Sequence, residues 1–226
     1  EWEAIQNWKT AKEVEYKAWF DESLEKLEIR REKAVENAGI KEALVQKAEE
    51  LSQQPGYFWA KQFDNPANPS IHYQTTGQEI IQAFDGETPD AFVAGIGTGG
   101  TITGVGRALK EKNAAVQIIG VEPEEAPFIS KGQKGKHRIQ GISAGFLPSI
   151  IDKEVIDDFE LIPSELAIET AKKLAATEGI LTGISSGAAV AAALRVAKKL
   201  GKGKTVVALL PDTGERYLST GIFNQE

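Results

Sequence analysis

The sequence has 226 residues, a net charge of −7, two histidines and no cysteine. A chain of this length can bury the core of one α/β domain, or of a domain with an appendage. The acidic balance argues against a nucleic-acid-binding surface, and the lack of cysteine excludes disulfides and cysteine-based metal sites. We therefore expect no metal site and interpret His72 and His137 as surface or loop residues. No apolar run approaches membrane-spanning length and the charged start is unlike a signal peptide, so we expect no membrane association and a soluble, cytoplasmic protein.

Residues 1–38 differ in composition from the rest of the chain. They hold three of the four tryptophans and neither glycine nor proline. Their apolar residues recur mostly at steps of three or four, which is typical of one face of a helix; they are Trp2, Ile5, Trp8, Tyr16, Trp19, Phe20, Leu24 and Leu27. The segment is predicted to be a helical addition, as one helix or two, joined to a second domain at residues 39–226.

From residue 39 onward, apolar strands alternate with amphipathic helices. Helices are predicted at 40–51, 70–84, 102–111, 164–178 and 188–200, and strands at 57–63, 91–96, 115–121, 159–162 and 204–210. Ser164 is expected to cap its helix, and residues 131–145 to form a loop beside the ligand. This order predicts an α/β fold with an open, parallel, doubly wound sheet that binds its ligand at the carboxyl ends of the strands.

A glycine-rich stretch follows the second of these strands and opens into a helix. It contains Gly97, Thr98, Gly99, Gly100 and Thr101. Glycines at such a turn let the backbone approach a ligand, and the free amides of a helix start attract anions. We interpret this stretch as a phosphate cradle, with a plain glycine turn as the alternative. The stretch 180–187 repeats the pattern of apolar run, glycine, hydroxyls and helix.

A dinucleotide site is a competing interpretation of the same glycines. Gly95, Gly97 and Gly100 satisfy G-x-G-x-x-G, and Glu122 follows where an acidic residue would hold a ribose. The spacing of the glycines alone does not favour an NAD-type site over a monophosphate site, or the reverse.

From Ile40 to about Ser219, the sequence resembles the carboxyl-terminal two-thirds of cysteine synthase, the O-acetylserine sulfhydrylase of the fold-type II pyridoxal-phosphate family. The segments that carry the resemblance are KQFDNPANPSIHYQTTGQEI at 61–80, AGIGTGGTITGVGRALKEKN at 94–113, GVEP at 120–123, KHRIQGISAGFLP at 136–148, GISSGAAVAAAL at 183–194 and PDTGERYLST at 211–220. Together they favour pyridoxal phosphate over a dinucleotide.

The resemblance implies specific roles for residues of this chain. The phosphate would lie on residues 97–101, and a serine hydroxyl, Ser185 in preference to Ser186, would hydrogen-bond the pyridine nitrogen. A neutral partner there favours β-elimination and replacement over transamination. On the substrate side the resemblance places Gln62, Phe63 and the loop 140–145, including Gln140 and Gly141, with residues 211–213 near the ring. The family reaction is β-replacement on O-acetylserine with sulfide to give cysteine.

One part of the family pattern has no counterpart in this sequence. The Schiff-base lysine in its Ser-x-Lys context and the Ser-Gly-Asn-Thr-Gly loop are absent, and Lys61 is a candidate by proximity alone. We therefore expect no catalytic residue, non-covalent cofactor binding, and an impaired or inactive domain. A truncated, chimeric or engineered scaffold, suggested also by the absence of methionine, is the alternative. We expect a small phosphate-bearing ligand as the partner, and we leave a homodimer open. The family also implies serine acetyltransferase as a partner. We do not expect it to bind here, because half of the cleft that would receive it is missing.

Overall fold

The computed structural model describes residues 40–223, so the predicted segment 1–38 and the predicted boundary after it lie outside the described residues. The chain divides into two compact units, residues 1–60 and 61–226. In the first, helix α2 covers Ile40–Ser52, as the sequence predicts. In the described part of the chain, none of the helices is both long and apolar enough to cross a membrane.

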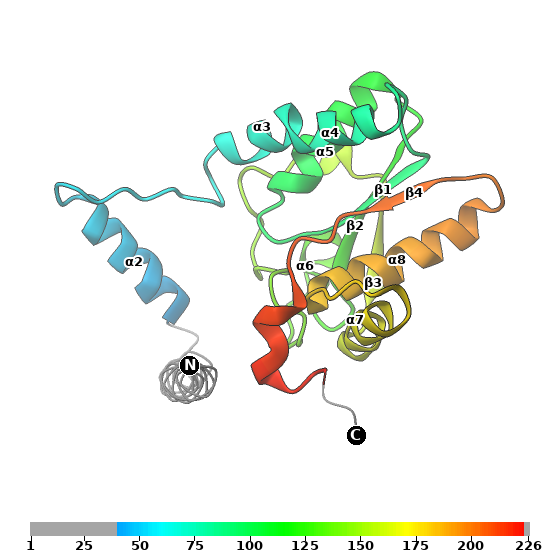
Figure 1. Ribbon diagram of the computed structural model, residues 1–226. Helices are drawn as coiled ribbons and strands as arrows, with labels where there is room; N and C mark the ends of the chain where they lie inside the picture. The colour runs from blue at the N-terminus through cyan, green and yellow to red at the C-terminus, as the bar shows by residue number, and fades with distance from the viewer. Residues whose placement is uncertain (1–39, 224–226) are drawn as a thin grey trace, which may run out of the picture. The chain divides into compact units, whose positions relative to one another are not determined.

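The second unit is built on one parallel sheet, drawn in Figure 1. Its strands are β1 (Ala91–Gly95), β2 (Gln117–Pro123), β3 (Asp158–Ile162) and β4 (Val206–Ala208). Their order is β3-β2-β1-β4, and all three pairings are parallel. The predicted α/β class with a parallel sheet flanked by helices is confirmed.

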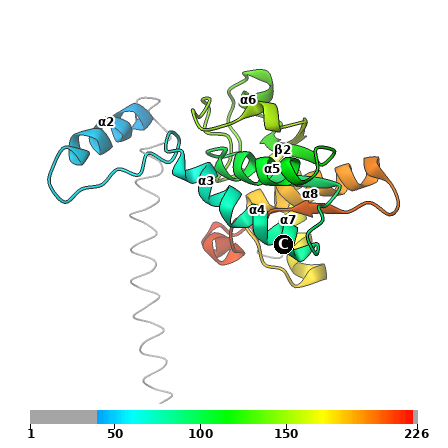
Figure 2. The same cartoon turned by 90° about the horizontal axis from the view of Figure 1, so that it is seen from above.

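The helices of this unit cover both faces of the sheet. They are α3 (Ala67–Gln74), α4 (Thr76–Ala83), α5 (Gly100–Lys112), α6 (Phe128–Lys131), α7 (Ser164–Glu178) and α8 (Ile184–Leu200). Short 3-10 helices cover Lys153–Val155 and Gly214–Thr220. Figure 2 shows α3 and α4 alongside α5.

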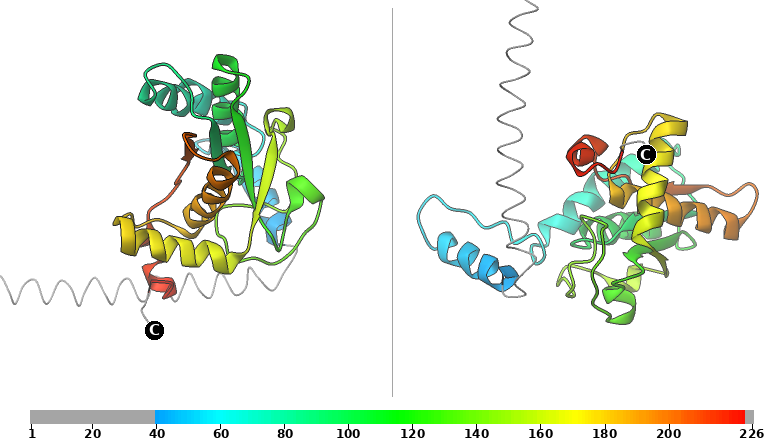
Figure 3. Two further views of the ribbon diagram at one scale, coloured as in Figure 1. Left: turned by 90° about the vertical axis from the view of Figure 1, so that its right-hand side faces the viewer. Right: turned by 90° about the horizontal axis from the view of Figure 1, so that it is seen from below.

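Side chains of β1 alternate between two apolar cores. Ala91 and Val93 pack with buried residues of α7 and α8, whereas Phe92 and Ala94 pack with those of α5. This alternation follows from the two-residue period of a strand, and burial on both faces explains why β1 reads as a continuous apolar run. Figure 3 shows α7 and α8 packed side by side.

Three predictions about elements are wrong. Residues 57–63 form no strand; Phe58 is 86% exposed there, so the segment lacks the burial that stabilises a strand. The helix predicted at 70–84 is two helices, which divide at Thr75, where the backbone is distorted from ideal helical angles to φ −118° and ψ −77°. Ser164 does not cap α7: the cap position is Pro163, and the Ser164 hydroxyl accepts from the backbone N–H of Arg138.

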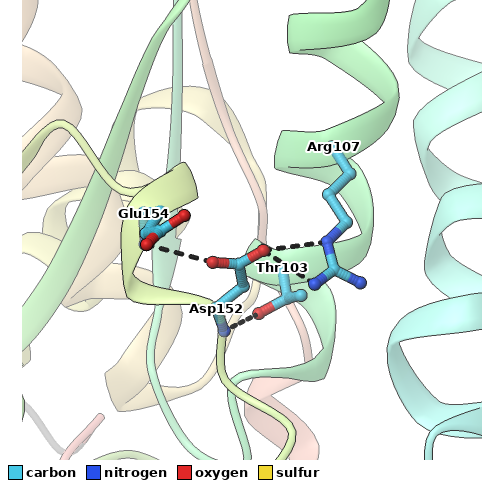
Figure 4. A network of polar contacts seen from close by, with 4 residues as sticks. All are labelled: Thr103, Arg107, Asp152 and Glu154. Atoms are coloured by element: carbon cyan, nitrogen blue, oxygen red, sulfur yellow. Dashed lines mark hydrogen bonds and ion pairs between the residues drawn. The ribbon is translucent and has the colours of Figure 1, made fainter.

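A polar network joins α5 to the segment that follows residue 150 (Figure 4). The carboxylate of Asp152 accepts two hydrogen bonds from Arg107, at 3.0 and 2.7 Å, and a third from the backbone N–H of Glu154. The backbone N–H of Asp152 donates to Thr103 at 3.0 Å. These bonds hold the neighbouring Ile151 against the start of α5, where a Cβ on Gly99 would lie 2.8 Å from it.

Candidate cofactor site

A cleft lies at the carboxyl ends of β1 and β4. After β1 the chain continues to β2 on one side, whereas β4 pairs with the other side of β1. Ligands of open α/β sheets bind where the strand order reverses in this way. The cleft there has a volume of about 420 Å³, within the range of small-molecule sites. Its lining residues are Gly95, Gly97, Thr98, Gly99, Thr101, Gln140, Gly141, Ile142, Ser185, Leu209, Pro211, Asp212, Arg216 and Tyr217.

The predicted phosphate loop forms one wall of this cleft. Gly99, at the N-cap of α5, has φ +84°, a conformation that favours glycine, and α5 begins at Gly100. Behind the loop, a Cβ on Gly97 would lie 2.5 Å from the carbonyl oxygen of Gly141, and one on Gly100 would lie 1.9 Å from the Asn68 side chain. The glycines therefore serve close packing behind the loop, while the start of α5 and the two threonines face the cleft.

The loop at residues 139–145 packs against the phosphate loop and lines the cleft beside it. The backbone N–H of Ser143 donates to the carbonyl of Ile96 at 2.8 Å, and the Ser143 hydroxyl donates to the carbonyl of Ala126 at 2.9 Å. These bonds tie the loop to the end of β1, so Gln140 and Gly141 line the cleft with the phosphate loop. A Cβ on Gly141 would lie 3.8 Å from the Ser185 hydroxyl.

The two serines at the start of α8 have different environments. Ser186 is fully buried and donates to the carboxylate of Asp212 at 3.1 Å. Ser185 lines the cleft, and within the described part of the chain its hydroxyl has no hydrogen-bond partner. The geometry therefore leaves Ser185, the serine preferred from the sequence, free to bind a ligand.

The floor of the cleft near Ser185 is fixed by Tyr217. Its phenolic O–H donates to the second carboxylate oxygen of Asp212. Burial, and then this hydrogen bond to a carboxylate, raise the pKa of Tyr217 above its usual range. Because the neutral phenol is favoured, Tyr217 holds Asp212 as a hydrogen-bond donor at neutral pH.

Gln62 and Phe63 are not among the residues that line the cleft. The Gln62 carbonyl accepts from the Asn68 side chain at 2.8 Å, and the Phe63 ring packs edge-on against Phe146, with 4.9 Å between ring centroids. Both lie next to α3. Their assignment to the substrate side remains a prediction.

Sequence reasoning missed four residues of the site. Arg216 and Tyr217 line the cleft, and Asn68 and His72 on α3 contact the threonines of the phosphate loop. Only His72 lies on the helix predicted at 70–84; Asn68 precedes it and joins the same helix only in the structure, where α3 begins at Ala67. Which helix packs behind the loop is a tertiary property. His72 is half-buried on α3, and burial lowers its pKa, so it is not the surface or loop residue that we expect from the sequence.

The dinucleotide interpretation fails at Glu122. Its side chain is fully buried, and its carboxylate accepts from the backbone N–H of Ile129 at 2.6 Å and from the backbone N–H and hydroxyl of Ser130, at 2.9 and 2.5 Å. A ribose would have to displace these bonds. Glu122 therefore stabilises the start of α6 and is not available to hold a ribose.

Comparison with known proteins identifies relatives for most of the chain. A family model described as "Pyridoxal-phosphate dependent enzyme" matches residues 29–212. Cysteine synthases of several Staphylococcus aureus strains are 50% identical over 180 residues, which are 80% of this chain and 58% of theirs. This chain thus spans less than two thirds of the length of these relatives.

Solved structures agree with these sequence matches. The cysteine synthase of Entamoeba histolytica is 42% identical, with a TM-score of 0.76, and the match covers 80% of this chain and 54% of that one. The O-acetylserine-dependent cystathionine beta-synthase of Helicobacter pylori is 43% identical, with a TM-score of 0.75 over 79% of this chain and 58% of that one.

Proposed function

The chain belongs to the family of pyridoxal-phosphate-dependent enzymes, and from this premise we propose that it forms the cofactor-binding part of a cysteine-synthase-like protein. The family reaction would be β-replacement on O-acetylserine with sulfide. The observation that carries the proposal is one cleft lined by both the threonines of the phosphate loop and the free hydroxyl of Ser185. A phosphate and a pyridine nitrogen are the two polar ends of this cofactor.

The residues present fit the cofactor. The start of α5 supplies backbone N–H groups and the positive end of a helix dipole, which suit a phosphate dianion. Thr98 and Thr101 add hydroxyl donors in the same wall. In the same cleft, the neutral Ser185 hydroxyl can donate to an unprotonated ring nitrogen.

When bound, pyridoxal phosphate supplies an electron-withdrawing ring that stabilises negative charge on the substrate carbon next to it. The role that we propose for this chain is to bind the cofactor and to orient it. Ser185, a neutral donor, leaves the ring nitrogen unprotonated and limits this withdrawal, which favours elimination and replacement over transamination. Asp212 does not compete for this role because Ser186 and Tyr217 occupy its carboxylate.

Proton transfer at the substrate carbon is the step for which we propose no residue of this chain. The family's Ser-x-Lys motif does not occur in the sequence. We therefore propose that the chain by itself binds the cofactor without a covalent bond and is impaired or inactive in β-replacement.

The test is a titration with pyridoxal phosphate followed by absorbance, borohydride reduction and mass spectrometry of peptides. We expect saturable binding, no single lysine labelled, and no cysteine formed from O-acetylserine and sulfide. Lys61→Arg should leave these results unchanged. Reduction onto one specific lysine would overturn the non-covalent assignment, and a folded protein without saturable binding would overturn the cofactor assignment in favour of a structural scaffold.

A further inference from the structure

Helix α3 presents two polar side chains to the phosphate loop. Asn68 and His72 are four residues apart and therefore lie on the same face of the helix. The side-chain nitrogen of Asn68 lies 3.1 Å from the Thr98 hydroxyl oxygen, and Nε2 of His72 lies 3.2 Å from that of Thr101. Each cleft threonine thus has a partner on the side away from the cleft.

The close approach of α3 to α5 depends on two glycines of α5. A Cβ on Gly100 would lie 1.9 Å from the Asn68 side chain, and a Cβ on Gly104 would lie 2.2 Å from the carbonyl oxygen of Pro69. Real Cβ atoms do not come so close to other atoms, so glycine is required at both positions for the side chains of α3 to reach the loop.

The direction of the Asn68 hydrogen bonds follows from its partners. The Gln62 carbonyl, 2.8 Å away, can only accept, which identifies the contacting Asn68 atom as the amide nitrogen. The second hydrogen of this nitrogen donates to Thr98, whose oxygen also accepts from the backbone N–H of Gly100 at 3.3 Å. With both lone pairs of Thr98 engaged, its own proton is left to donate elsewhere.

His72 bridges two hydroxyl groups. Its Nδ1 lies 3.0 Å from the Thr76 hydroxyl, and its Nε2 faces Thr101. A neutral imidazole has one donor and one acceptor nitrogen. With Nδ1 accepting from Thr76, Nε2–H donates to Thr101, and the Thr101 proton is then free to donate as well.

We propose that α3 is a positioning element for the phosphate: Asn68 and His72 donate to Thr98 and Thr101, so that both threonine hydroxyls donate into the cleft toward a phosphomonoester dianion. Because donors oriented in advance need no reorganisation when an anion binds, they bind it more tightly than freely rotating hydroxyls. The inference rests on the proposed function, since it assigns the phosphate to this wall.

The test compares His72→Asn with His72→Gln in binding pyridoxal phosphate and pyridoxal. A glutamine amide nitrogen can replace Nε2 as donor to Thr101, whereas the shorter asparagine cannot reach it. We expect His72→Asn to weaken pyridoxal-phosphate binding about fivefold to tenfold, the effect of one lost hydrogen bond between neutral groups. His72→Gln should restore affinity to within about twofold of the parent, and Asn68→Leu should match His72→Asn.

Two controls separate positioning from folding. Gln74→Ala, an exposed change at the end of α3, should leave binding unchanged, and no variant should alter binding of pyridoxal, which lacks the phosphate. In ¹⁵N NMR spectra, His72 should carry its proton on Nε2 when inorganic phosphate or pyridoxal phosphate is bound.

Three outcomes would contradict the account. Equal affinities of the two His72 variants, or a phosphate-bound His72 protonated only on Nδ1, would overturn the positioning role while leaving the proposed function intact. A parent chain that binds neither pyridoxal phosphate nor inorganic phosphate would overturn the proposed function, and the inference with it.

Discussion

Asp212 gives different roles to two adjacent serines at the start of α8. Its carboxylate is bonded to Ser186 and Tyr217, which leaves Ser185 to the cleft. Two neighbouring serines in a helix point in different directions, so sequence alone states only that one of the two is available. The resemblance favours Ser185, and the bonds of Asp212 to Ser186 and Tyr217 agree with this prediction.

Substituting each serine separates binding from stability. Ser185→Ala should leave the free energy of unfolding within about 0.5 kcal/mol of the parent but alter the absorbance spectrum of bound pyridoxal phosphate. Ser186→Ala removes a buried donor from a carboxylate and should cost about 1–2 kcal/mol of stability. Urea unfolding and cofactor titration of both variants measure the two effects; a destabilised Ser185→Ala with an unchanged spectrum would reverse the assignment.

Tyr217 predicts a dependence of stability on alkaline pH. Its pKa is raised in the folded protein, so its contribution to stability is complete below the unfolded pKa of about 10 and declines as pH rises above that value. Tyr217→Phe should therefore lose about 1 kcal/mol of stability at pH 7 and show a shallower decline than the parent above about pH 10. Urea midpoints at pH 7 and pH 10.5 test this, and parallel declines in the two proteins would contradict it.

Among the elements, α8 shows how a small-residue surface determines packing. A Cβ on Gly187 would lie 2.1 Å from the carbonyl oxygen of Ala167 and 2.8 Å from the backbone nitrogen of Ala171, so the backbones of α7 and α8 are in direct contact. The alanine-rich sequence of α8 predicts close packing, but its partner in this contact, α7, is known only from the structure.

Gly187→Ala should force α7 and α8 apart. Because backbone atoms of α7 cannot move away as a flexible side chain can, we expect a loss of about 2–3 kcal/mol in the free energy of unfolding. Leu194→Ala, on the same helix at a position that is 65% exposed, should change it by less than about 0.5 kcal/mol. Chemical denaturation of both variants provides the comparison; equal effects would mean that the helix contact is not tight.

Most elements of the sheet unit can be predicted from the sequence because their apolar periodicity is strong. Strands β1 and β3 and helices α5 and α7 fall within two residues of their predicted bounds. The strand predicted at 57–63 is wrong because aromatic residues are typical of buried strands, but Phe58 is exposed here. Burial depends on neighbours that no local pattern reveals. The break at Thr75 has a signal in the sequence, since Gly77 lies two positions later, but a single glycine is also tolerated inside a helix.

At the scale of the whole unit, the site follows from the strand order. The reversal between β1 and β4 brings residues 97–101 and 209–217, more than one hundred positions apart in the chain, to one cleft. The glycine motifs predict a ligand at the carboxyl ends of the strands. They do not predict which loops meet, because parallel pairing between distant strands leaves no local signal.

If this cleft holds the phosphate of pyridoxal phosphate, the chain should distinguish pyridoxal phosphate from pyridoxal. Fluorescence titration at neutral pH gives the dissociation constants of both compounds. We expect pyridoxal phosphate to bind about tenfold tighter or more, because several donors meet the dianion, and inorganic phosphate to compete with it. Equal affinities for the two compounds, with no competition by phosphate, would contradict it.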